Sequence, residues 1–124
     1  GRVAESASAC LLMVRDGTVY TPPPTEGALE SITVDIIEAL ARSLRIDFVR
    51  RPIDRTELLV ADEVALCGTL SEVVPVRGID GYQLPSAGVV PVLQARYFDA
   101  VRGIDAHPSV IYSFVPVPER APAA

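Results

Sequence analysis

Residues 31–44 carry the pattern that most restricts the fold of this chain. Six apolar residues recur there at helical spacing along one face: Ile32, Ile36, Ile37, Leu40, Ala41 and Leu44. Such spacing is typical of an amphipathic helix that packs against a core. Ser31 or Thr33 can cap its start, and the basic residues Arg42 and Arg45 follow at its end, where the helix dipole favours cations. The sequence therefore predicts a helix over 31–44 with one buried face.

A β-hairpin is predicted before this helix. The apolar run 11–14 and the β-prone run 19–21 are separated by a segment that contains Asp16-Gly17. An Asp-Gly pair between two such runs favours a tight hairpin turn. Three consecutive prolines at 22–24 follow, and they end the pairing because proline cannot donate to a strand ladder.

The rest of the chain alternates short strands with helical segments. Strands are predicted over 47–53, 63–66, 72–76 and 110–117, a short helix over 54–60, a turn at 80–81 and a helix over 89–102 that ends at Gly103. Together these elements predict an α/β fold of the mixed α+β kind, with two main helices and about six short strands. We expect one domain over 1–103, followed by a terminal strand and a Pro-rich tail over 104–124 that includes Pro122.

Charge and hydropathy exclude several classes of partner. The chain has 16 acidic and 11 basic residues and a net charge of −5, which argues against binding to nucleic acid. No apolar run reaches the roughly 18 residues that a membrane span needs, so no membrane partner is expected. Cys10 and Cys67 could form one disulfide, but we expect packed, reduced thiols in a cytoplasmic protein.

The chain contains no lysine, since all 11 basic residues are Arg. Mechanisms that need a lysine Schiff base or a P-loop lysine are therefore excluded for these 124 residues acting alone. His107 is the single histidine, so a multi-histidine metal site is excluded and no metal is predicted. We expect His107 to be a loop residue before Pro108 rather than a catalytic group.

Three segments, in order, resemble the carboxy-terminal half of class IV aminotransferases, the fold type IV enzymes that use pyridoxal 5′-phosphate (PLP). The first is GRVAESASAC at 1–10, followed by the apolar strand and Asp16-Gly17. The second joins Thr-Pro-Pro at 21–23 to LESIT at 29–33. The third comprises Glu-Leu at 57–58, ADEV at 61–64, Gly-Thr at 68–69 and EVVPV at 72–76. Branched-chain aminotransferases are the most similar members, and the resemblance implies their pseudo-barrel architecture.

The resemblance also implies roles for particular residues. Glu5 would pair with the pyridine nitrogen of PLP, keeping it protonated so that the ring can accept electrons, and is the candidate catalytic residue. Leu29 would pack on the ring. Ile32 and Thr33 would bind the phosphate, as the free N–H groups of a helix start also favour an anion. The pair Gly68-Thr69 would add phosphate contacts and shape the side of the pocket that takes the substrate carboxylate.

The chain departs from the family pattern at several positions. The family's catalytic Lys and its smaller amino-terminal domain precede the matched segments and are not among these residues. Val34 stands where the family has Arg, and Cys10 where it has Asn. We therefore expect a truncated, lysine-free domain that binds PLP non-covalently, if at all, and does not perform transamination alone.

Two other classes of function stay open. The chain could be a standalone enzyme, of isomerase or cyclase type, that uses the old cofactor pocket for another small molecule with Glu5 as acid or base. It could instead be a non-catalytic binding subunit that covers its apolar surface by homo-oligomerisation or with a partner chain. Whether the chain is an enzyme is thus undecided by the sequence.

Overall fold

The computed structural model describes residues 1–86, 88–119 and 123. Five strands form the main sheet: β1 (Cys10–Arg15), β2 (Thr18–Thr21), β3 (Phe48–Arg50), β4 (Glu63–Gly68) and β5 (Glu72–Val76). Two short strands, β6 (Gly78–Ile79) and β7 (Tyr82–Gln83), pair separately as a small hairpin. The helices are α1 (Ile32–Ser43) and α2 (Val89–Val101), with two 3-10 segments, η1 (Pro24–Glu26) and η2 (Arg55–Val60).

The sheet has the strand order β3-β2-β1-β4-β5, so β1 lies at its centre, between β2 and β4. All neighbours are antiparallel except β2 and β3, which run parallel. The predicted hairpin joins β1 to β2, with both turn residues in the left-handed region, Asp16 at φ 50° and Gly17 at φ 76°. This is the type I′ conformation that Asp-Gly favours because it matches the twist of the strands.

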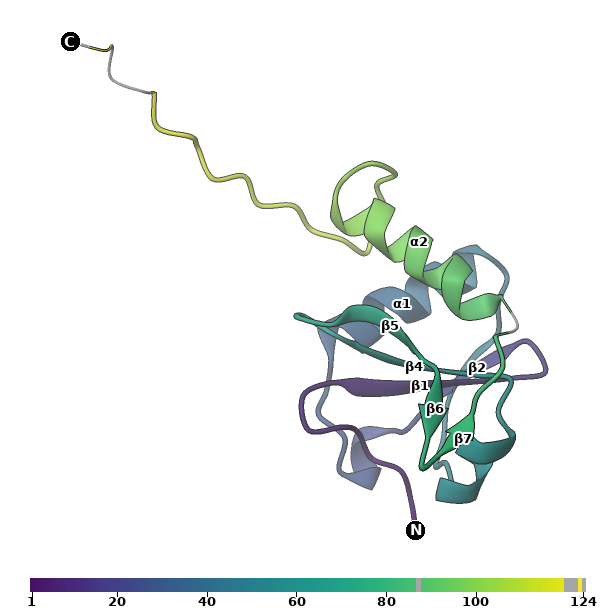
Figure 1. The fold of residues 1–124 in the computed structure, drawn as a ribbon. Helices are drawn as coiled ribbons and strands as arrows, with labels where there is room; N and C mark the ends of the chain where they lie inside the picture. The colour runs from purple at the N-terminus through teal and green to yellow at the C-terminus, as the bar shows by residue number, and fades with distance from the viewer. Residues whose placement is uncertain (87, 120–122, 124) are drawn as a thin grey trace.

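Both long helices cover one face of the sheet, as Figure 1 shows. Each helix contributes buried apolar residues to this core, among them Val34, Ile37, Leu93 and Tyr97, which pack with Leu12 of β1. The helix predicted over 31–44 is therefore confirmed. Ile37, Leu40 and Ala41 of its predicted apolar face are buried, whereas Ile32 and Leu44, at its two ends, are exposed. Ser31 is its N-cap, since the Val34 N–H donates to the Ser31 hydroxyl oxygen at 3.2 Å.

A second, smaller core lies on the opposite face of the sheet. Ile53, Leu58 and Ala61, in and around η2, pack there against residues of β1 and β4. Because β1 and β4 are covered on both faces, β1 is a continuous apolar run rather than an alternating one. The mixed α/β class and the two main helices are thus confirmed.

Several element boundaries differ from the sequence expectation. The strand predicted over 47–53 is shorter, Phe48–Arg50, and β4 continues two residues past the strand predicted over 63–66, through Cys67 and Gly68. The short helix predicted over 54–60 is a 3-10 segment, Arg55–Val60, with Asp54 at its N-cap position. The Asp54 N–H donates to the Glu57 carboxylate at 3.0 Å. Pro75 is accommodated because β5 is an edge strand.

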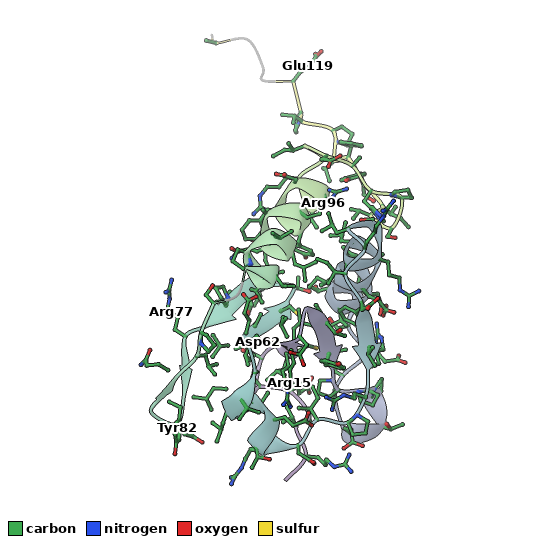
Figure 2. All side chains as sticks on the ribbon, turned by 90° about the vertical axis from the view of Figure 1, so that its right-hand side faces the viewer. Arg15, Asp62, Arg77, Tyr82, Arg96 and Glu119 are labelled. Carbon is green, nitrogen blue, oxygen red and sulfur yellow. The ribbon has the colours of Figure 1, made fainter. Side chains whose placement is uncertain are left out.

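The strand predicted over 110–117 is not formed, although all of these residues are described. Val110 and Tyr112 still pack beside α2, with the Tyr112 hydroxyl donating to the Ala100 carbonyl. Beyond them the chain runs away from the body, as Figures 1 and 2 show, and Phe114 is 90% exposed. β-prone residues form no strand here because no neighbouring strand offers hydrogen-bond partners, and Pro116 lacks a donor. Of the predicted tail, residues 120–122 and 124, Pro122 included, lie outside the described residues.

Candidate functional site

A cavity of about 440 Å³ opens at the amino-terminal end of α1. It lies between three segments: residues 5–10, which lead into β1; residues 29–32, which lead into α1; and residues 67–70, which end β4. A volume of this size is in the range of small-molecule sites. The arrangement of the sheet explains why these distant segments meet.

β1 and β4 are antiparallel neighbours in which Cys10 lies opposite Cys67. The residues before β1 and the residues after β4 therefore reach the same end of the sheet. α1 packs, through Val34 and Ile37, on the face of the sheet to which Leu12 of β1 points, and its first turn lies at that end. The cavity is thus a product of strand register and helix packing.

Glu5 connects two walls of the cavity. The Leu29 N–H donates to Glu5 Oε2 at 3.0 Å, and the Cys10 Sγ lies 3.9 Å from the same oxygen. The Cys10 Sγ is also 3.8 Å from the Leu29 carbonyl oxygen. Glu5 is exposed and lines the cavity.

The first turn of α1 offers N–H groups to the cavity. The Ser31 hydroxyl oxygen accepts the Val34 N–H, whereas the N–H groups of Ile32 and Thr33 have no acceptor among the described residues. Ile32 is 80% exposed, whereas Thr33 is buried. Free N–H groups and the helix dipole make this end of α1 suited to an anion.

The cavity brings together five of the six residues singled out from the sequence: Glu5, Leu29, Ile32, Gly68 and Thr69. Thr33 follows directly after the lining residues and is buried in α1. Ser6, Glu30 and Leu70 also line the cavity and were not singled out, although each adjoins a residue that was. Ser6 shapes the wall, because its hydroxyl oxygen accepts the Ala9 N–H at 3.0 Å.

The two cysteines are free thiols at the base of this cavity. Burial raises the pKa of the Cys67 thiol to about 12, so it is protonated at neutral pH. His107 accepts the Ser109 N–H after α2 and is not among the described residues that line the cavity. Within the described part of the chain, no group of three or more His, Cys, Asp or Glu side chains could hold a metal ion.

Comparison with known proteins identifies the family. Residues 1–79, more than half of the chain, match the family described as amino-transferase class IV. This chain belongs to the class IV aminotransferases. A probable branched-chain-amino-acid aminotransferase of Aquifex aeolicus is 41% identical over 107 residues, which cover 83% of this chain and 34% of that protein. The Escherichia coli K12 branched-chain-amino-acid aminotransferase is 39% identical over 106 residues, with the same coverage.

Solved class IV structures share the fold. The branched-chain aminotransferase of Thermobaculum terrenum in its PLP form superposes with a TM-score of 0.81 at 39% identity, covering 85% of this chain and 36% of that one. The enzyme of Thermoproteus uzoniensis, solved with norvaline, gives a TM-score of 0.82 at 33% identity and covers 85% of this chain and 35% of that one. The chain thus spans about a third of the length of these class IV relatives. None of its described helices is long and apolar enough to cross a membrane.

Proposed function

We propose that this chain is the part of a class IV aminotransferase that binds the phosphate and the ring nitrogen of PLP. The observation that carries the proposal is one cavity lined by both Glu5 and Ile32, the first residue of α1, whose N–H has no acceptor among the described residues. These are the two kinds of group that the two ends of PLP require: an anion for the protonated ring nitrogen and donors for the phosphate.

The residues present fit the cofactor in type. Ile32 and Thr33 would hold the phosphate, Glu5 the ring nitrogen, and Leu29, which is 75% exposed at the rim, would cover the ring. The space around Gly68 supports a ligand role for the end of β4. A Cβ at this position would lie no closer than 3.8 Å to atoms of Ala9 and Ser8, so packing within this chain does not require glycine there. When bound, PLP supplies an electron sink for chemistry at an amino acid Cα.

These residues alone are not expected to perform transamination. Covalent attachment of PLP needs a lysine amine, and the chain contains none. A lysine would have to come from another segment or from a partner chain. The rim of the cavity favours such a partner or a second copy, because Leu29, Ile32 and Leu70 are 75%, 80% and 97% exposed.

The proposal is tested by titrating the purified chain with PLP, following absorbance and binding heat together. We expect saturable, non-covalent binding with the spectrum of a free aldehyde. Ile32→Pro removes one N–H from the phosphate subsite at the first helical position, where proline is tolerated. Ser31, at φ −130° and ψ 120°, is already extended, as a residue before proline must be.

The matched control is Ile32→Ala, which shortens the same side chain but keeps the N–H. We expect Ile32→Pro to weaken PLP binding at least tenfold, whereas Ile32→Ala binds within about twofold of the parent chain. Pyridoxal, which lacks the phosphate, should not distinguish the two variants. Glu5→Gln should weaken the binding of both PLP and pyridoxal. No binding at millimolar PLP would refute the proposal and leave the cavity as a site for another small molecule.

A further inference from the structure

The fold places its two cysteines directly opposite each other. Cys10 of β1 and Cys67 of β4 are register partners, although they are far apart in the sequence. Residues directly opposite in an antiparallel pair point to the same face, with Cα atoms about 4.5–5.5 Å apart. Disulfides span Cα separations of about 4.4–6.8 Å, so this pair can be bridged without moving the strands.

Both thiols line the cavity, but they differ in accessibility. Cys10 is partly exposed and its Sγ is turned toward Glu5 Oε2 and the Leu29 carbonyl, at 3.9 and 3.8 Å. Cys67, on the neighbouring strand, is fully buried. A reagent that enters the cavity therefore meets Cys10 first, and rotation of the Cys10 side chain turns its sulfur toward Cys67.

We propose that Cys10 and Cys67 form a dithiol modification site, which reacts with small-molecule disulfides that enter the cavity and closes to a Cys10–Cys67 disulfide. The inference does not depend on PLP binding, because it rests on strand register and on access to the cavity.

The reaction proceeds by two thiol–disulfide exchanges. The Cys10 thiolate attacks one sulfur of the small disulfide, whose S–S bond breaks and releases one thiol, leaving a mixed disulfide on Cys10. Cys67 gives up its proton to solvent, attacks the Cys10 sulfur and releases the second thiol. Two protein thiols are thereby oxidised, and one small disulfide is reduced to two thiols.

Formation of the Cys10–Cys67 disulfide changes the lining of the cavity. The Cys10 sulfur leaves Glu5 and Leu29, which it contacts in the reduced chain. The second exchange should be slower than the first, because the buried Cys67 thiol loses its proton with difficulty, and it should accelerate as the pH rises.

The test uses the reduced, folded chain and 2,2′-dithiodipyridine, whose released thiopyridone is coloured. We expect the parent chain to release two thiopyridones per chain in two phases, and intact mass to show the loss of two hydrogens without an adduct. Cys67→Ala should release one thiopyridone and retain the thiopyridyl adduct on Cys10. Cys10→Ser should react at least tenfold more slowly than the parent chain in its first phase.

Two results would overturn the inference. One is a parent chain that keeps the adduct on Cys10 while Cys67 stays reduced; the other is a disulfide between two chains, visible on a non-reducing gel. Circular dichroism of the parent chain before and after oxidation establishes that the reaction takes place in the folded state. Since the decisive measurement is made on the parent chain, it holds even if a variant fails to fold.

Discussion

At the scale of single residues, Arg51 and Glu57 form a bidentate ion pair. The two Arg51 terminal nitrogens donate to the two Glu57 carboxylate oxygens at 3.0 and 2.8 Å, and the Arg51 guanidinium lies 4.3 Å from the centre of the Tyr20 ring. The Asp54 N–H also donates to Glu57. The pair therefore ties the start of η2 to the sheet.

This pair predicts a loss of stability in acid. The hydrogen bonds from Arg51, and then that from Asp54, lower the pKa of Glu57 from 4.5 to about 2. As the pH falls from about 4.5 to about 2, the unfolded chain takes up a proton that the folded chain does not, so the free energy of unfolding decreases. Above this window the contribution of Glu57 is complete.

Urea unfolding at a series of pH values measures this effect. Glu57→Gln and Arg51→Gln should each flatten the pH dependence over that window, the first because the titrating group is gone and the second because its partner is gone. A parent chain and variants whose unfolding free energies fall in parallel would contradict the prediction.

At the scale of elements, one buried carboxylate joins the sheet to α2. Glu63 of β4 is 3% exposed, and it accepts the Val89 N–H at 2.7 Å and the Val90 N–H at 3.2 Å. The N-cap position itself is Gly88, which has no side chain to serve as a cap. Glu63, a residue of β4, therefore serves as the cap that Gly88 cannot provide. Its carboxylate lies at the positive end of the dipole of α2.

Glu63→Ala should destabilise the fold by about 2–3 kcal/mol, because it leaves the buried Val90 N–H and the partly buried Val89 N–H without an acceptor. Glu63→Gln should cost less, since its amide oxygen can still accept one of them. The control is Glu72→Gln, which weakens the exposed pair with Arg102 and should cost less than about 1 kcal/mol. Urea midpoints measure all three, and equal midpoints for Glu63→Ala and Glu72→Gln would exclude a capping role.

At the scale of the whole molecule, the packed body extends past the domain boundary predicted at residue 103. Val110 packs against the main core, and Tyr112 donates to Ala100 of α2. Ile111, in contrast, is 92% exposed, and residues 114–119 are also exposed. We therefore propose that the packed part of the chain extends to about residue 113.

Two shortened chains test this boundary. A chain ended after Ser113 should have an unfolding free energy within about 0.5 kcal/mol of that of the parent chain, because the described residues among those removed are exposed. A chain ended after Gly103 should lose about 1–3 kcal/mol of unfolding free energy, because it lacks the apolar contact of Val110 and the hydrogen bond of Tyr112. Both are measured by urea unfolding, and equal stability of the two would place the boundary back at residue 103.

The sequence by itself determined the elements that local chemistry specifies. Periodicity predicts α1 and α2 within a residue or two, and Asp16-Gly17 predicts the hairpin, because backbone preferences act between neighbouring residues. The motifs predicted the residues of the candidate site, of which all but Thr33 line one cavity.

Only the tertiary structure decided which distant segments meet. The parallel pairing of β2 with β3, the register of Cys10 with Cys67 and the Glu63 cap on α2 link residues that no local pattern connects. The absence of a strand over 110–117 has the same cause, since strand propensity is realised only when a neighbouring strand supplies hydrogen-bond partners. Pairing and burial are properties of the assembled fold, so neighbouring residues in the sequence do not determine them.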